Sequence, residues 1–148
     1  VEYNFLSKEE FCHSIKDRIL ESRSYDVNSD VWTYGFMKQE IDVYGDYVAI
    51  TTLEGYNKFI EHYGSNNVCG IYIYVDEVDR IKRCMNRELD NVVPNFKELM
   101  RRLEVDEFDF SYEKLFESKI INVVENSDIE DCYNEILVFI GGQNEQSF

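Results

Sequence analysis

The hydrophobic pattern of this chain changes along its length. Near the N-terminal end, polar and apolar residues alternate on either side of Asn28-Ser29-Asp30, which predicts a β-hairpin formed by residues 21–25 and 31–34. Further along, β-branched and aromatic residues form nearly continuous apolar runs, which are typical of strands buried on both faces of a parallel sheet. The strands predicted from these runs are 47–53, 68–75 and 119–124.

Segments with a helical period lie between the apolar runs. Ser7 and Glu10 have the spacing of a capping box, which predicts a helix from Ser7 to about Asp17. Pro94 predicts the first turn of another helix, because proline is well tolerated there. Gly141-Gly142 is expected to end the last helix. The other predicted helices are 37–43, 54–63, 77–89 and 128–140. This alternation of strands and helices favours an α/β fold in a single domain, 1–148.

Composition narrows the possible partners. The 148 residues include 30 acidic and 15 basic side chains, a net charge of −15, which argues against nucleic acid or an anionic membrane surface as partner. No apolar run approaches the roughly 20 residues that span a bilayer, and no signal-peptide pattern is present. The four cysteines form no C-x-x-C pair, so we expect reduced thiols, no structural metal, and a cytoplasmic location.

The basic residues are concentrated in one segment. Seven of the fifteen lie between Arg80 and Arg102, against three acidic residues, so this segment carries +4. They are Arg80, Lys82, Arg83, Arg87, Lys97, Arg101 and Arg102. Two predicted helices joined by residues 90–93 would carry them on a helical flap, opposite an apolar stripe of Val78, Ile81, Met85 and Leu89. Guanidinium groups match phosphate oxygens, but a simpler interpretation is a solvated flap whose arginines pair with Glu88, Glu98 and Glu104.

Several short motifs occur in an order that resembles guanylate kinase. The motifs are Tyr3-Asn4-Phe5, Ser7, Phe11, Leu20-Glu21, Tyr34-Gly35, Arg83-x-x-x-Arg87, Arg101-Arg102-Leu103 and Val124-Glu125-Asn126-Ser127-Asp128-Ile129. The resemblance runs from Val1 to about Ile140. It implies phosphoryl transfer from ATP to GMP on a P-loop kinase-like parallel sheet flanked by helices. The implied regions are a β-rich GMP-binding region 1–36, core 37–78 and 111–142, a helical lid 79–110 and a tail 143–148.

The resemblance also implies roles for individual residues. Tyr3 and Tyr34, with Gly35, would bind the GMP phosphate, and Glu21 would read guanine. Arg83, Arg87 and Arg102, with Arg101 beside it, would neutralise charge on the transferring phosphoryl group. Asn126, with Arg83, would bind ATP beside its adenine, and Mg²⁺ is the implied metal. No oligomeric state follows.

The proposed chemistry of Glu21 can be stated independently of the resemblance. A carboxylate accepts two parallel hydrogen bonds from guanine N1–H and the exocyclic amine. Adenine has no N1–H, and a buried acceptor left unpaired can discriminate by about 10⁴. Each site residue also has a simpler interpretation: Tyr3 and Tyr34 as strand aromatics, Glu21 as a solvated edge-strand charge, and Asn126-Ser127-Asp128 as a helix cap.

The chain departs from the guanylate kinase pattern in two respects. It contains no G-x-x-x-x-G-K-[S/T] phosphate loop and no Gly-Lys pair, so we expect the chain as given to be inactive and the native protein to be longer. The expected first strand would lie between strands 47–53 and 68–75, and the Mg²⁺ ligands would precede Val1. In addition, Phe36 replaces a serine or threonine that touches guanine, and Ile50-Thr51-Thr52 replaces an Asp-x-Asp.

These departures leave other functions open. One alternative is a non-catalytic guanylate-kinase-like module that binds a phosphorylated or acidic peptide in the GMP site. Another is a kinase for a different nucleoside monophosphate, such as dGMP.

Overall fold

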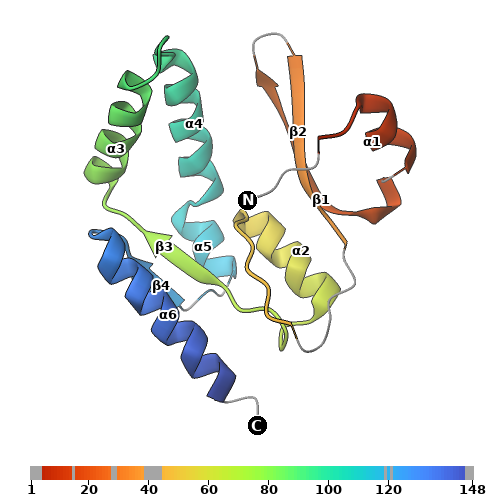
Figure 1. The fold of residues 1–148 in the computed structure, drawn as a ribbon, viewed down its shortest axis with the longest axis vertical. Helices are drawn as coiled ribbons and strands as arrows, with labels where there is room; N and C mark the ends of the chain where they lie inside the picture. The colour runs from red at the N-terminus through yellow and green to blue at the C-terminus, as the bar shows by residue number, and fades with distance from the viewer. Residues whose placement is uncertain are drawn as a thin grey trace. The chain divides into compact units, whose positions relative to one another are not determined.

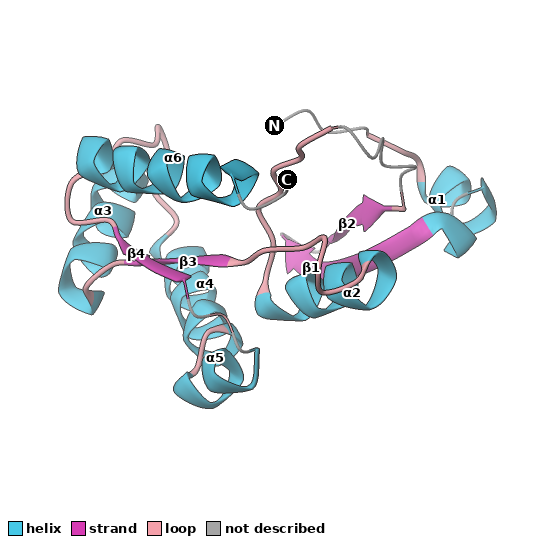
Figure 2. Cartoon of the chain, turned by 90° about the horizontal axis from the view of Figure 1, so that it is seen from below, coloured by secondary structure: helices cyan, strands magenta, loops and turns pink. Residues whose placement is uncertain are grey.

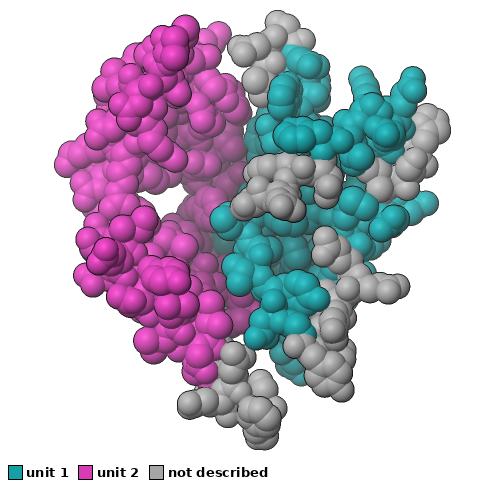
Figure 3. Space-filling model, in the orientation of Figure 1, with its two compact units in different colours: residues 1–68 teal, residues 69–148 magenta. Residues whose placement is uncertain are grey.

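A computed structural model of the chain describes residues 5–14, 16–27, 30–38, 45–118, 120 and 122–145. Within these residues the protein is mixed α/β, with six α-helices, a two-stranded antiparallel sheet and a two-stranded parallel sheet (Figures 1 and 2). The chain divides into two compact units, residues 1–68 and 69–148 (Figure 3). The assignment of residues 1–148 to one domain stays a prediction.

The first unit contains the predicted hairpin and two helices besides a short 3₁₀ turn. Its elements are α1 (Lys8–Ser14), the 3₁₀ turn Lys16–Arg18, β1 (Ile19–Val27), β2 (Asp30–Met37) and α2 (Leu53–Tyr63). The capping box is confirmed, because Glu10 N–H donates to Ser7 Oγ at 3.3 Å and Ser7 N–H donates back to Glu10 Oε2 at 2.8 Å. The helix nevertheless ends at Ser14, before the predicted Asp17.

The register of the hairpin sorts its side chains onto two faces. Glu21 lies opposite Phe36, Arg23 opposite Tyr34, and Tyr25 opposite Trp32, so these six residues share one face. Phe36 packs edge-on against Phe59 of α2, with ring centroids 5.3 Å apart. The face that carries Glu21 and Tyr34 is therefore the one that α2 covers in part.

The strand predicted at 47–53 is not formed. Residues 45–52 have no regular structure, and α2 begins at Leu53, capped by the Thr52 hydroxyl, which accepts from Gly55 N–H at 3.2 Å. Val48 and Ile50 are 85% and 81% exposed. An apolar run becomes a strand only when a neighbouring strand pairs with it, and no described strand pairs with this one. Of the predicted helix 37–43, Met37 ends β2, Lys38 has no regular structure, and the rest lies outside the described residues.

The second unit confirms the predicted parallel pairing. Its elements are β3 (Ile71–Tyr74), α3 (Glu77–Leu89), α4 (Phe96–Asp109), α5 (Tyr112–Ser118), β4 (Asn122–Glu125) and α6 (Ile129–Glu145). β3 and β4 run parallel, with Ile71 opposite Asn122 and Tyr74 opposite Glu125. Both strands are shorter than predicted, and α5 was not predicted.

The parallel sheet is not buried on both faces, contrary to the prediction. Val124 of β4 and Cys132 of α6 are buried, whereas the neighbouring Val123 is 55% exposed, and Ile73 is 47% exposed. Successive side chains of a strand point to opposite faces. α6 lies beside β4 (Figure 1). On the face that carries Val123, the ring of Tyr72 stacks on Phe110 with centroids 6.0 Å apart, so each face of the sheet is covered only in part.

Two helix boundaries also differ from the prediction. α4 begins at Phe96 instead of Pro94, because the Asn95 side chain accepts from Glu98 N–H and caps it. α6 continues through Gly141-Gly142 to Glu145, since glycine inside a helix costs only about 1 kcal/mol.

The covered face of α4 is narrow. Leu99 is buried and Leu103 half-buried, but Phe96 and Met100 of the same helix are exposed. In α3, the predicted apolar stripe is largely open, with Val78, Met85 and Leu89 exposed.

Candidate functional site

Two of the predicted GMP-binding residues lie on the same face of the hairpin. Glu21 of β1 and Tyr34 of β2 both project from the face that meets α2, because their partners in the ladder are Phe36 and Arg23. Another predicted GMP-binding residue, Tyr3, lies outside the described residues. The first unit thus places the carboxylate of Glu21, the guanidinium of Arg23 and the phenol of Tyr34 on one face of a small sheet.

The carboxylate of Glu21 is nearly buried and has no hydrogen-bond donor in the described part of the chain. Its side chain is 11% exposed, and its nearest charge is Arg23 Nε, 3.8 Å from Oε1, which is too far for a hydrogen bond. Burial raises the pKa of Glu21, against the opposing charge of Arg23, while the negative charge of Glu54 raises it further. Because buried carboxylates normally accept hydrogen bonds, this one is an acceptor available to a ligand.

Arg23 joins the hairpin to α2. Its Nη2 donates to Glu54 Oε2 at 3.1 Å, and its side chain is only 22% exposed. Sequence reasoning missed Arg23 as a site residue. Its spacing of two residues from Glu21 within a strand was the available signal, because such residues share a face.

The first turn of α2 forms the other side of this site. Gly55 is buried, and a Cβ at this position would overlap Thr51 Oγ1 and lie 3.6 Å from Glu21 Oε2. Glycine therefore allows the helix to approach β1 closely. Thr51 Oγ1 is itself buried and has no hydrogen-bond partner among the described residues.

Tyr34 and Gly35 have different environments. The Tyr34 side chain is among the exposed aromatics, with its ring 6.5 Å from Trp32 and 6.2 Å from Tyr25. Gly35 lies against the other strand, since a Cβ there would be 2.5 Å from the carbonyl oxygen of Glu21. Close backbone approach explains this glycine, and its assignment to GMP binding stays a prediction.

In the second unit, the structure brings together Arg83 and Asn126, the two residues predicted to bind ATP. Arg83 Nη1 donates to Asn126 Oδ1 at 3.3 Å, and Nη2 donates to the carbonyl oxygens of Asn126 and Ser127 at 2.9 and 3.1 Å. Asn126 N–H donates to the carbonyl of Tyr74 at 2.8 Å. This cluster lies at the carboxyl ends of β3 and β4, the edge at which parallel sheets of α/β proteins bind ligands.

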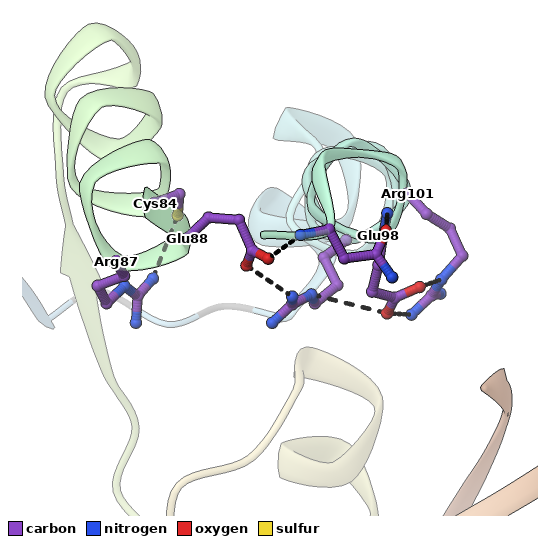
Figure 4. A network of polar contacts seen from close by, with 7 residues as sticks. Cys84, Arg87, Glu88, Glu98 and Arg101 are labelled. Carbon is purple, nitrogen blue, oxygen red and sulfur yellow. Dashed lines mark hydrogen bonds and ion pairs between the residues drawn. The ribbon is translucent and has the colours of Figure 1, made fainter. Parts of the chain in front are cut away.

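Three other flap arginines, Arg87, Arg101 and Arg102, have partners within the flap (Figure 4). Arg101 and Arg102 both pair with Glu98, at 2.6 and 3.6 Å, and Arg102 also reaches Glu88 at 3.5 Å. Arg87 donates to Cys84 Sγ at 3.2 Å. The simpler interpretation was that the flap arginines pair with Glu88, Glu98 and Glu104. It is confirmed for Arg101 with Glu98 and for Arg102 with Glu88 and Glu98.

Glu88 connects the two helices of the flap. It is buried, and its carboxylate accepts from the backbone N–H of Asn95, the capping residue of α4, as well as from Arg102. Figure 4 shows this side chain extending from α3 toward the start of α4.

Comparisons of this chain with protein-family models, with curated protein sequences and with solved structures found no match. The resemblance to guanylate kinase therefore stays a prediction.

Within the described residues, no three His, Cys, Asp or Glu side chains are grouped so that they could hold a metal ion. None of the described helices combines the length and the apolar character needed to cross a bilayer.

Proposed function

We propose that the chain binds GMP in its first unit and acts in the ATP-dependent phosphorylation of GMP to GDP, as its resemblance to guanylate kinase implies. The observation that carries this proposal is the Glu21 carboxylate, nearly buried and without a hydrogen-bond donor among the described residues. Guanine offers two adjacent N–H donors that match one carboxylate, whereas adenine offers none at N1. Tyr34, on the same face, would contact the phosphate together with Tyr3 and Gly35.

The second unit supports the nucleotide-binding part of the proposal. Arg83 and Asn126 meet at the carboxyl ends of two parallel strands, where we propose that ATP binds with Asn126 beside the adenine. Arg83, Arg87 and Arg102 would neutralise charge on the phosphoryl group, because phosphoryl transfer depends mainly on positioning and charge stabilisation. Arg102 would exchange its pairing with Glu88 and Glu98 for phosphate oxygens.

Transfer also needs a phosphate-binding loop, which this sequence does not contain. Such a loop supplies backbone N–H groups, a lysine and an Mg²⁺-binding hydroxyl. We therefore propose that this chain contributes GMP binding and the flap arginines, within a P-loop kinase-like fold.

Calorimetric titration of the chain with GMP and AMP tests the proposal. We expect GMP to bind and AMP to bind at least tenfold more weakly, since the wrong base leaves the Glu21 carboxylate unpaired. Glu21→Gln should remove this preference, because a neutral amide cannot accept both hydrogen bonds, while Glu61→Gln, an exposed change on α2, should keep it. Equal binding of GMP and AMP, or binding of neither, would contradict the proposal.

One observation favours a second function. Phe36, at the position of a guanine-contacting hydroxyl in guanylate kinases, packs on Phe59. This favours a non-catalytic module that binds a phosphorylated or acidic peptide. Binding of a phosphoserine peptide without binding of GMP would support it. A kinase for another nucleoside monophosphate would instead show tighter binding of a nucleotide such as dGMP.

A further inference from the structure

Glu21 and Arg23 place an acceptor and a donor side by side. They are two residues apart on β1, so their side chains leave the same face of the strand. Their exposed fractions are only 11% and 22%, and the 3.8 Å between Oε1 and Nε is longer than a hydrogen bond. The two charged groups are therefore adjacent but are not hydrogen-bonded to each other through these atoms.

This pair matches one edge of guanine better than a carboxylate alone. The edge presents two donors, N1–H and the 2-amino group, next to one acceptor, O6. A carboxylate satisfies the two donors, and arginine donates readily to O6. We propose that Arg23 is a second base-reading residue of the GMP site, donating to guanine O6 beside Glu21. This inference rests on the proposed function.

The surroundings of Arg23 support this role. Glu54 of α2 accepts from its Nη2 at 3.1 Å, which holds the guanidinium with its Nε side toward Glu21. Phe36 lies opposite Glu21 in the ladder and is packed on Phe59, so it offers no donor for O6. Arg23 supplies the donor that Phe36 lacks.

Adenine would make two unfavourable contacts with the pair of Glu21 and Arg23. At the corresponding positions adenine has an unprotonated N1 and a 6-amino donor. Its N1 would face the carboxylate acceptor, and its amino group would face the guanidinium donor. Specificity then comes from two mismatches instead of one.

The test uses 6-thioguanosine monophosphate, which keeps N1–H and the 2-amino group but has sulfur, a weak acceptor, at position 6. Affinities of GMP and the thio analogue are measured by calorimetry for the wild-type chain, Arg23→Ala and Arg23→Leu. The leucine variant keeps an apolar stem over the hairpin in case the alanine variant does not fold. Arg18→Ala, an exposed arginine of the same unit, is the matched control.

We expect the wild-type chain and Arg18→Ala to bind GMP about tenfold or more tightly than the thio analogue. Arg23→Leu should lose about this factor for GMP alone, so that the ratio of the two affinities falls to about one. Equal weakening of both ligands would mean that Arg23 only positions Glu21, and would overturn the inference while leaving GMP binding intact. If the wild-type chain binds no GMP, the proposed function fails, and this inference fails with it.

Discussion

The guanidinium of Arg83 on α3 holds the loop after β4 by donating to both the side-chain and the main-chain carbonyl of Asn126. The planar guanidinium group can serve several acceptors at once, which an ammonium group serves less well. Arg83 thereby fixes the position of a loop more than forty residues further along the chain. A residue predicted from the sequence to stabilise charge on a phosphoryl group also has a structural partner.

Replacing Arg83 should reveal this structural contribution. Arg83→Ala leaves the carbonyls of Asn126 and Ser127 without a donor, and we expect it to lower the free energy of unfolding by about 1 kcal/mol in urea denaturation. Lys82→Ala, which removes only the exposed pair with Asp79, should cost less than about 0.5 kcal/mol. An equal loss in the two variants would show that the Asn126 contacts contribute nothing.

Glu88 should be the most sensitive acidic residue of the flap. Glu88→Gln weakens the acceptor for Asn95 N–H and Arg102 in a buried position, so we expect a loss of about 1–3 kcal/mol in the free energy of unfolding. Glu104→Gln, on the exposed side of α4, is the control and should change stability by less than about 0.5 kcal/mol. Chemical denaturation of the two variants measures both losses, and an equal loss would contradict the special role of Glu88.

Adjacent threonines before α2 should respond in opposite directions to the same change. Thr51 Oγ1 is buried, and no residue in the described part of the chain hydrogen-bonds to it, so Thr51→Val should leave stability unchanged or raise it by up to about 1 kcal/mol. Thr52 caps α2, so Thr52→Val should lower the free energy of unfolding by about 1 kcal/mol. Thermal unfolding of both variants tests this difference. A larger loss for Thr51→Val than for Thr52→Val would mean that the Thr51 hydroxyl has a partner after all.

The raised pKa of Glu21 predicts how stability depends on pH. Burial raises this pKa above that of an unfolded glutamate, about 4.3. Between these two values the folded chain keeps a proton that the unfolded chain has lost, so the free energy of unfolding falls as pH rises through this window.

Glu21→Gln has no proton to lose and should lack this fall. Arg23→Leu should extend it to higher pH, because the charge of Arg23 lowers the pKa of Glu21 while that of Glu54 raises it. Denaturation curves from about pH 4 to pH 7 measure the effect. If the free energy of unfolding depends on pH in the same way for the wild-type protein and Glu21→Gln, the raised pKa of Glu21 does not contribute.

Local patterns predicted the elements whose partners are close in the sequence. The hairpin is visible in the alternation around residues 28–30, and the capping box needs only Ser7 and Glu10. The strand at 47–53 failed because extended structure depends on a neighbouring strand, which no hydrophobic run specifies by itself. β3 and β4 were correctly predicted as strands, but their burial was overestimated, because a hydrophobic run does not specify which elements cover the sheet.

The site residues that could be predicted were those that residue type and sequence order alone identify. Glu21 and Tyr34 were named from the resemblance, and the observed register puts them on one face. Arg23 was missed because its importance comes from Glu54 on a different element. Pairings such as Arg83 with Asn126 require tertiary structure, since sequence patterns do not fix contacts over long separations.

The bridge made by Glu88 has a mechanical consequence. It clamps the end of α3 to the start of α4, so a change of angle between the two helices would first break its contact with Asn95 or Arg102. The helix pair therefore bends more easily at the non-helical residues 75–76, before α3, and 110–111, after α4. The two helices would then swing as a stiff arm, carrying Arg87 and Arg102 together instead of one at a time.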